Sequence, residues 1–479
     1  MNHRYSKKGF LLVLVLVFGS IFFMMASAFI GYVITQSHLT QAKYNKERAL
    51  DIAEAGLDYY KWFLVHNPND TTNGTGATGP YVHTYNDPEG SAIGEFSLDI
   101  ASSTACGEVY AIDITSTGYT YDDPDVERVV YGRYARPTVA EFAYIINSNV
   151  WAGADRVIVG PYHSNGGIRM DGTNNSTVTS GQETWSCTSS YGCSPTNNNA
   201  NGVLGNGPND ELWSFPSTPI NFTGITVDLS AMQDKAQNHG GRYFGPSGGH
   251  GYRVVFKNNG TIDVYRVTNT TSYWGYSTED GWQSERHVIS ASTLLGNYTI
   301  PSTCSIIYAE DKVWLEGVVK GKVTIAAADV DTAGVDPRII LNSNITYANA
   351  TSGLLAIAED DVLVGLSVPD DMILNGIFVA QNGRFGRNHY CQSECDSSHG
   401  GSEGLPSSLD PYHKRDTLTV NGTIVSNGRE GTKWTSAGVY SSGFNTRYNS
   451  YDRDLVSDPP PLTPDVSDTY EFIEWREMD

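Results

Sequence analysis

An apolar run near the start of the chain is the feature that most limits what this sequence can fold into. From Phe10 to Ile34 only Tyr32 carries an ionisable group. As a helix rising 1.5 Å per residue, this run would be about 37 Å long, enough to cross a bilayer with some tilt. Arg4, Lys7 and Lys8 precede it, and basic residues before a span favour a cytoplasmic N-terminus. The sequence therefore predicts a membrane-spanning helix with the rest of the chain on the extracytoplasmic side.

The residues around this run leave three explanations for it: a cleaved signal peptide, an uncleaved anchor, or one half of a longer helix. A signal peptide would be cleaved after Ala26-Ser27-Ala28, although the apolar residues continue past that site. From Thr35 to Leu64 there is no proline and no glycine before Gly56, and small and apolar residues recur at steps of three and four. This spacing predicts one helix over residues 10–65, apolar in its first half and amphipathic in its second. The recurring residues are Ala42, Ala49, Ile52, Ala53, Gly56, Leu57, Tyr60 and Leu64.

The leader and the helix together resemble a known class of filament subunits. A short basic leader ending in Gly9, an aromatic residue at Phe10 and a two-part helix resemble a type IV prepilin. The segment ALDIAEAGLDYY (49–60) more narrowly resembles minor pilins of the PilX kind. In that family a prepilin peptidase in the membrane cuts after the glycine, and the new N-terminus is often methylated. The resemblance therefore implies cleavage between Gly9 and Phe10, followed by packing of the helix against other pilins or pseudopilins.

One position departs from the family pattern. Most pilins carry Glu at the fifth mature position, where it neutralises the terminal ammonium group of a neighbouring subunit; counted from Phe10, that position is Leu14. Because an uncompensated charge is costly in apolar surroundings, a subunit without this acid fits the tip of a filament better than its shaft. The resemblance implies a minor pilin-like or pseudopilin-like subunit of a type IV pilus or a type II secretion-type filament. Such a subunit is a single-pass protein of the cytoplasmic (inner) membrane before assembly and belongs to a cell-surface filament afterwards.

The rest of the chain is predicted to be β-structure in two parts. Between residues 80 and 137, strand-length blocks predict a small antiparallel region that packs against the amphipathic end of the helix. Further on, blocks of the form acid-x-Val-x-aliphatic end in glycine at 154–160, 310–317 and 359–365. Short strands separated by Gly, Asn and Asp favour a right-handed parallel β-solenoid, in which stacked turns bury the Val and Ile that one turn cannot bury alone. An irregular double-sheet sandwich is the alternative.

The expected fold class is α+β, mostly β, with a hairpin insertion in the solenoid-like domain. GYRVVFKNNGTIDVYRV (251–267) places two alternating strands around Asn-Asn-Gly, which tolerates positive φ and predicts a hairpin. The large C-terminal part, with its VYRV hairpin and its proline-rich tail, resembles regions attached to PilX-type N-termini in many bacteria, and this resemblance implies architecture and little mechanism. The expected parts are a leader over 1–9, the helix over 10–65, the pilin-like β-region over 80–137, the solenoid-like domain over 138–460 with an insertion at about 203–300, and a tail over 461–479.

An aromatic-rich stretch follows the predicted hairpin. It contains Tyr273, Trp274, Tyr276 and Trp282, and rings of this kind can stack on sugars. These residues make the chain a candidate membrane-anchored adhesin or carbohydrate-binding protein with a surface glycan as partner, which is compatible with a filament role. The other interpretation is a hydrophobic cluster beneath the loop.

Six cysteines, an even number, fit an oxidising compartment. Two pairs lie close together in the sequence and predict local disulfides, and the remaining two cysteines could form a long-range one. The pairs are Cys187 with Cys193, Cys391 with Cys395, and Cys106 with Cys304. A zinc site is an alternative for the second pair, since His389 and His399 lie beside it, and free thiols are another.

Charge and motifs argue against a nucleic-acid partner and against catalysis. The chain has 31 basic and 53 acidic residues and a net charge of -22, whereas phosphate binding needs an excess of Lys and Arg. GPSGG (245–249) matches the serine-hydrolase elbow around Ser247, but the residues after it cannot begin a helix well. His163, beside Ser164 and Asn165, fits a hydrogen-bonded turn better than a catalytic site. We expect no catalytic residues and no enzymatic activity.

Acidic turns provide one further alternative. Parallel solenoids often act as polysaccharide lyases that use Ca²⁺, and Asp-rich turns supply the oxygen ligands that this ion requires. Turns favour Asp for structural reasons as well, so no cofactor and no metal site are expected, with structural calcium and a β-helix lyase site as the alternatives. The candidate acids are Asp329, Asp331, Asp336, Glu359, Asp360 and Asp361.

Overall fold

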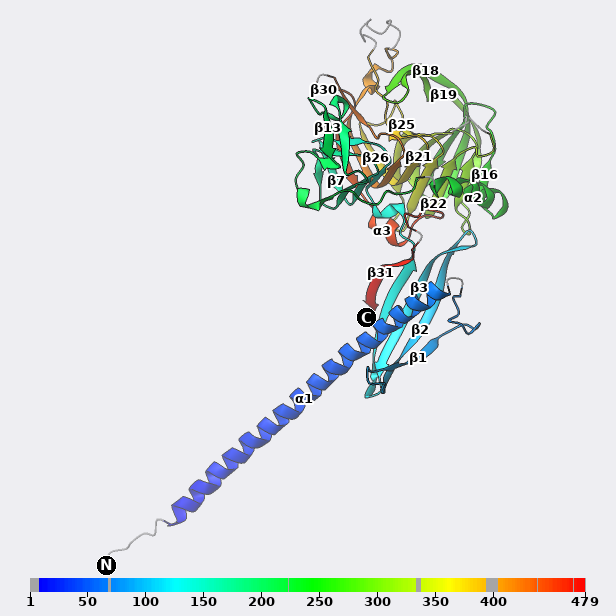
Figure 1. The fold of residues 1–479 in the computed structure, drawn as a ribbon. Helices are drawn as coiled ribbons and strands as arrows, with labels where there is room; N and C mark the ends of the chain where they lie inside the picture. The colour runs from blue at the N-terminus through cyan, green and yellow to red at the C-terminus, as the bar shows by residue number, and fades with distance from the viewer. Residues whose placement is uncertain are drawn as a thin grey trace, which may run out of the picture. The chain divides into compact units, whose positions relative to one another are not determined.

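The chain is mostly β, with one long N-terminal helix and several sheets (Figure 1). The structure, a computed structural model, describes residues 8–67, 70–222, 224–332, 337–392, 404–436, 438–467 and 469–478. It divides into two compact units. The first comprises Met1–Ser103, Ala111–Tyr134 and Glu474–Asp479, and the second comprises Thr104–Tyr110 and Ala135–Ile473.

The helix α1 runs without interruption from Lys8 to His66, so the predicted continuous helix is confirmed. Its first half has no cover within the unit: Phe10 and Phe23, for example, are 75% and 74% exposed. By length and composition, α1 can cross a membrane. Because each Å² of apolar surface left in water costs about 25 cal/mol, this half of the helix requires an apolar environment.

The first unit contains a five-stranded sheet in the order β1-β2-β3-β4-β31. β1 pairs antiparallel with β2, and two-residue turns join β2 to β3 and β3 to β4, a length that only antiparallel neighbours allow. β31 comes from residues expected to form a tail. The strands are β1 (Tyr81–Asn86), β2 (Ala92–Ala105), β3 (Glu108–Thr120), β4 (Asp123–Ala135) and β31 (Glu471–Met478).

The second half of α1 packs closely on this sheet because small residues meet at the contact. A Cβ atom at Gly118 in β3 would collide with backbone atoms of Ala49 and Ala53, and one at Gly56 would collide with the Ser116 side chain. Most of the predicted helical stripe is buried, whereas Ala42 is exposed. This stripe of α1 therefore packs on the sheet of its own chain. Its buried members are Ala49, Ile52, Ala53, Gly56, Leu57, Tyr60 and Leu64.

The second unit consists mainly of short strands that pair in parallel. In one series, each strand is parallel to the next over ten strands. These are β16 (Arg242–Phe244), β20 (Ile306–Ala309), β22 (Lys322–Ala327), β24 (Gly353–Ala358), β26 (Asp371–Ala380), β28 (Lys414–Ser426), β5 (Tyr144–Ile146), β8 (Tyr162–Ser164), β11 (Val178–Ser180) and β15 (Trp213–Ser214).

Three shorter parallel series lie beside the first. One joins β17 (Tyr252–Phe256), β21 (Val313–Val319), β23 (Ile339–Tyr347), β25 (Val362–Val364) and β27 (Phe385–Gly386). The next joins β28 to β30 (Val439–Ser450), β7 (Arg156–Val159) and β10 (Thr173–Asn174). The last joins β6 (Val150–Ala152), β9 (Ile168–Met170) and β14 (Val203–Leu204).

The core of the second unit is built from rows of side chains that are in register along these series. Ile307, Ile325, Ala356, Phe378 and Ile424 occupy equivalent positions on successive strands, and all are buried in one cluster. Such rows bury apolar residues that a single strand would leave in water.

A row of asparagines runs along the same series at the strand ends. Asn427 donates to the carbonyl of Asn382 at 3.1 Å, Asn147 donates to the side chain of Asn427 at 2.7 Å, and Asn165 donates to that of Asn147 at 2.7 Å. Because each side chain both donates and accepts, the turns are linked by hydrogen bonds as well as by their cores.

The remaining elements include the hairpin predicted around Asn-Asn-Gly. β17 and β18 (Thr261–Ser277) are antiparallel there, as expected, and β18 then pairs antiparallel with β19 (Gly281–Thr299). The helix α2 (Gly224–Asn238) was not expected from the sequence. The others are β12 (Thr184–Cys187), β13 (Asn197–Asn201), β29 (Lys433–Ser436), α3 (Arg453–Ser457) and the 3-10 turns η1 (Val139–Glu141), η2 (Ser189–Tyr191), η3 (Asp210–Leu212) and η5 (Asp410–Tyr412).

Candidate functional site

The apolar half of α1 is the first candidate site. Gly9, in the predicted leader, lies in the first turn of the helix next to the exposed Phe10, and Leu14 is 43% exposed. The hydroxyl groups of Ser20 and Ser27 donate to carbonyl groups of the preceding turn, at 2.8 and 2.6 Å. Because these hydroxyls are satisfied within the helix, they do not oppose transfer of this half into hydrocarbon.

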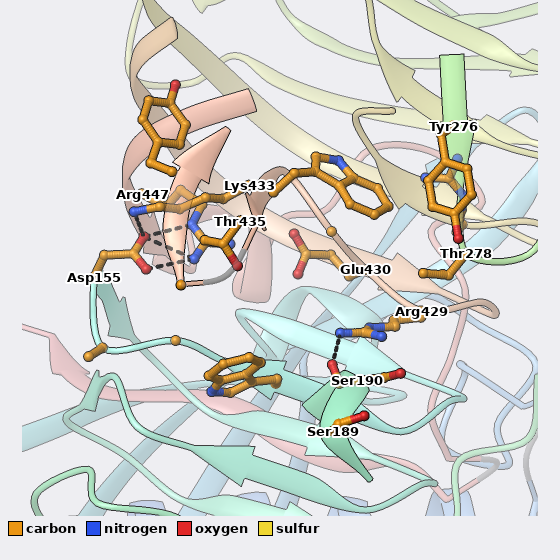
Figure 2. Close-up of a pocket in the computed structure, with 18 of the residues that line it drawn as sticks. Asp155, Ser189, Ser190, Tyr276, Thr278, Arg429, Glu430, Lys433, Thr435 and Arg447 are labelled. Atoms are coloured by element: carbon orange, nitrogen blue, oxygen red, sulfur yellow. Dashed lines mark hydrogen bonds and ion pairs between the residues drawn. The ribbon is translucent and has the colours of Figure 1, made fainter. Parts of the chain in front are cut away.

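A cavity of about 630 Å³ in the second unit is the other candidate site (Figure 2). Segments that lie far apart in the sequence form its wall: β6 with the turn after it, the turn η2, the end of β18, residues 429–435 around β29 with Gly438 and Tyr440, and the single residues Arg384 and Arg447. Aromatic side chains of Trp151, Tyr276, Trp434 and Tyr440 lie among charged ones. This combination of apolar rings with a few polar groups is typical of small-molecule sites, whose volumes run from about 300 to 1,000 Å³.

Most charged groups of the cavity are paired with one another. Arg447 donates to both carboxylate oxygens of Asp155 at 2.9 Å, and Lys433 lies 3.6 Å from the same group. Burial raises the pKa of Asp155, but the positive charges of Arg447 and Lys433 outweigh it and hold the pKa below its ordinary value. Beneath the wall, Arg156 forms an ion pair with Glu430, and both side chains are 1% exposed. These groups comprise three cations and two carboxylates, so this part of the cavity keeps a net positive charge.

Arg429 is held differently. Its Nη2 donates to the carbonyl of Ser190 at 2.8 Å, and its guanidinium carbon lies 4.5 Å from the centre of the Tyr191 ring. The figure shows the guanidinium directed at the η2 turn (Figure 2). That turn is closed by a disulfide between Cys187 and Cys193, with an S–S distance of 2.03 Å. The position of Arg429 is thus defined by a covalently closed turn.

The two tryptophans of the cavity wall have their indole N–H groups bonded within the protein. The indole N–H of Trp151 donates to Asp171 at 2.8 Å, and that of Trp434 donates to the carbonyl of Arg387 at 2.8 Å. The centroids of the Trp434 and Tyr276 rings are 5.7 Å apart in an edge-to-face arrangement. The two tryptophans therefore offer a ligand ring surface rather than hydrogen-bonding groups.

The four aromatic residues expected to bind a ligand do not act as one group. Tyr273 is 3% exposed and packs with Tyr390 in a buried cluster. Tyr276 lines the cavity, and Trp282 is its cross-strand neighbour, with ring centroids 5.6 Å apart. Trp274 pairs with Ser284 in the same hairpin and is partly buried. Sequence reasoning thus found one residue of the wall and missed Trp151, because its neighbours in sequence give no aromatic pattern.

The cysteines that the structure describes are disulfide-bonded. Besides Cys187–Cys193, Cys106 forms a disulfide with Cys304, with an S–S distance of 2.11 Å. Cys391 is disulfide-bonded as well and so is not a thiolate ligand for zinc. Its predicted partner Cys395 lies outside the described residues, as does His399.

The serine and histidine considered for catalysis have structural partners. The hydroxyl of Ser247 donates to Asp311 at 2.5 Å and accepts from the amides of Gly249 and Gly251 at 3.0 and 3.1 Å. His163 is 3% exposed and has Thr179 and Asn165 within 2.9 Å of its two ring nitrogens. The side chain of Ser164 donates to the carbonyl of Ser148 at 2.8 Å. These contacts close turns and link neighbouring strands of the parallel series.

The acids considered for calcium also have protein partners. Asp360 pairs with Arg338, Asp361 accepts from the amide of Arg384 at 2.8 Å, and Glu359 accepts from that of Asp329 at 2.7 Å. Asp331 accepts from Gln233 at 2.8 Å, and Asp336 lies outside the described residues. Across the part of the chain that the structure describes, there is no group of three or more His, Cys, Asp and Glu side chains placed to hold a metal ion.

Comparisons with known proteins give a similarity of structure. No family model and no curated protein matches the sequence. Among solved structures, the chain is similar to the crystal structure of the competence-associated pilin ComZ from Thermus thermophilus, with 11% sequence identity over 91% of this chain and 97% of that one. The TM-score is 0.28.

Proposed function

We propose that this chain is a minor pilin-like or pseudopilin-like subunit of a type IV pilus or type II secretion-type filament. One observation carries the proposal: α1 is a single helix from Lys8 to His66, apolar and exposed in its first half and packed on an antiparallel sheet in its second. The first half would hold the subunit in the cytoplasmic membrane, with its N-terminus inside and both β-rich units outside. On assembly the same surface would move from lipid to the helices of other subunits.

The packing of α1 limits which of its surfaces is available to those subunits. Ala49, Ala53 and Gly56 lie on the chain's own sheet and are not available. Docking in a filament would instead use the apolar half and exposed residues beyond it, such as Leu39 and Tyr44, which are 54% and 49% exposed. Van der Waals packing between such helices, rather than any chemical reaction, would be the mechanism, and we propose that the chain is not an enzyme.

A position at the filament tip is the finer form of this proposal. It rests on Leu14, which stands where most pilins have an acid and offers no charge to compensate a neighbour's terminal ammonium group. The large second unit supports it too, because a subunit at the tip has fewer neighbours than one in the shaft. The parallel series of this unit, with their in-register rows, favour a parallel β-solenoid as its architecture.

Mass spectrometry of the mature N-terminus tests the proposal. In a host that carries a prepilin peptidase, we expect a chain that begins at Phe10, with an added methyl group on its amino nitrogen. Gly9→Leu should remain as the uncut precursor, and Gly31→Ala, a change in the same helix with open space around it, should be cut normally. An intact Met1, or a chain that begins at Phe29, would overturn the proposal.

A surface-adhesin role is the second candidate, and the cavity around Trp151 and Trp434 favours it over a lyase role. The cavity offers aromatic surface to a ligand, whereas the acids that a lyase would need are held by Arg338 and by backbone amides. This role is compatible with the first one, since a filament tip is where a surface ligand would be met.

A further inference from the structure

We propose that the cavity of the second unit binds a saccharide that carries a carboxylate, such as a uronic or sialic acid. This inference gives the adhesin candidate a site and a ligand class, and it does not depend on how the N-terminus is processed. The site combines a platform of aromatic rings with one guanidinium that has no carboxylate partner among the described residues.

The charge of the cavity sets it apart from the rest of the chain. Four cationic side chains and three carboxylates line it, and one of these carboxylates, Glu430, is already neutralised from beneath by Arg156. The chain as a whole has a net charge of -22. A positively charged cavity in an acidic protein attracts anionic ligands and repels cationic ones.

Arg429 is the cationic side chain of the cavity that we assign to the ligand carboxylate. Arg447 and Lys433 share the carboxylate of Asp155, and Glu279 lies 3.4 Å from Arg384. Among the residues that the structure describes, no carboxylate pairs with Arg429. Its guanidinium has five N–H donors, and the bond to Ser190 uses one of them. The remaining N–H groups can donate to a carboxylate in the two-bond geometry that arginine favours.

The aromatic rings of the cavity favour a sugar as the ligand over a small anion such as phosphate. Trp434 and Tyr276 meet edge to face, and Trp151 lines the same cavity, with its ring next to Gly192 at the end of the η2 turn. With their N–H groups bonded internally, the tryptophans offer ring surface of the kind on which the C–H surface of a pyranose ring packs, and Arg169 covers one face of Trp151, its guanidinium carbon lying 5.0 Å from the ring centre. A bare phosphate or an acidic peptide would leave the ring surface in water. Nucleic acid is disfavoured by the overall charge.

Binding measurements on the full-length chain in detergent micelles test this assignment. The probes are trigalacturonate and trisialic acid as acidic sugars, maltotriose as a neutral sugar, and tri-glutamate as an anion without rings to stack. Titration calorimetry should detect the acidic sugars and neither of the other two. Binding of maltotriose with equal affinity would overturn the role of the carboxylate, and equal binding of tri-glutamate would overturn the role of the sugar ring. No binding of either acidic sugar would overturn the proposal itself.

Variants of single residues locate the site. Arg429→Gln should weaken binding at least about tenfold, because it removes a charge-assisted pair of hydrogen bonds. Arg429→Lys, which keeps the charge and the fold but loses the fork, should have an intermediate effect. Arg286→Gln, at an exposed arginine outside the cavity, is the matched control and should leave affinity unchanged.

The aromatic platform is tested in the same way. Tyr276→Ala should weaken binding of the acidic sugars about tenfold, and Tyr448→Ala, at a tyrosine that is 46% exposed elsewhere in the unit, should not. Unchanged affinity in both Arg429→Gln and Tyr276→Ala would overturn the assignment to this cavity. Since these assays do not involve cleavage after Gly9, their failure would leave the filament proposal standing, and the reverse also holds.

Discussion

The two units bury their cores in different ways. In β3, buried and more exposed residues alternate from Ile112 to Thr120, because one face of the strand covers α1. In β24, every residue from Gly353 to Ala358 is buried, as in parallel strands that are covered on both faces. A strand packed on one face depends on a single partner surface, whereas β24 is covered on both faces and pairs with a strand on each edge. We therefore expect the first unit to be sensitive to its one helix contact and the second to be sensitive to buried charge.

The largest effect should follow Arg156→Met in the second unit. The Arg156 guanidinium pairs with Glu430 and donates to the hydroxyl of Tyr144 at 2.8 Å, all out of contact with water. Removing one partner leaves the other charge buried without compensation, which lowers the free energy of unfolding by about 3–5 kcal/mol. Chemical denaturation in detergent, followed by hydrogen exchange of β5 and β28, measures the change.

The matched control removes both charges at once. Arg156→Met combined with Glu430→Gln leaves no uncompensated ion, so at least about half of the lost stability should return. A double variant less stable than Arg156→Met alone would show that packing around Arg156, and not its charge, stabilises this part of the stack.

A smaller effect is expected from Gly118→Leu at the contact of the first unit. A side chain there would meet the backbone of α1 at Ala49 and Ala53, which cannot move aside as a flexible side chain could. Overpacking of this kind costs about 1–3 kcal/mol. Hydrogen exchange of β2 and β3 should rise, while that of β22 and β24 stays as in the wild type.

Gly31→Ala is the control for this contact, since a Cβ atom there has open space in the same helix. It should leave exchange in β2 and β3 unchanged. If Gly118→Leu also left them unchanged, the close approach of helix and sheet would not be what stabilises the first unit.

The same comparison explains how much could be predicted from sequence. The helix and the Asn-Asn-Gly hairpin follow from local patterns, and both were found. A stripe such as Ala49, Ile52 and Ala53 shows that a helix face will be buried, but not by what. The helix face packs on β3 at Gly118, and a single glycine in a strand far along the chain gives no sequence pattern that predicts this contact.

The cavity could not be predicted from the sequence for a related reason. Trp151, Arg429 and Trp434 come together only because β28, β5, β7 and β30 stack in one order and register. Sequence shows which segments form strands but not which strands become neighbours, so a site assembled across the stack leaves no motif. The helix α2 was missed for a simpler reason: it begins at Gly224 with β-branched residues, which are poor helix formers.

The smallest expected effect is a difference in acid sensitivity between the units. Burial, with a contribution from His413, lowers the pKa of His389 to about 4, and burial also lowers the pKa values of His163 and His287. In the first unit, burial lowers the pKa of His83. A histidine of this kind stays neutral in the folded state while the unfolded chain takes up a proton near pH 6.5. Stability therefore falls as the pH drops from 6.5 toward 4, and more so in the second unit.

His389→Phe isolates one of these groups. It removes the titrating nitrogens but keeps a ring beside Trp282 and Trp434, whose centroids lie 5.9 and 5.7 Å from that of His389. Between pH 7 and pH 5 the variant should lose about 1–2 kcal/mol less stability than the wild type, as measured by denaturation at each pH. His239→Asn, at a side chain that is 47% exposed, should lose as much as the wild type. If both variants lost as much stability, the acid sensitivity of the second unit would have to come from its other buried histidines, His163 and His287.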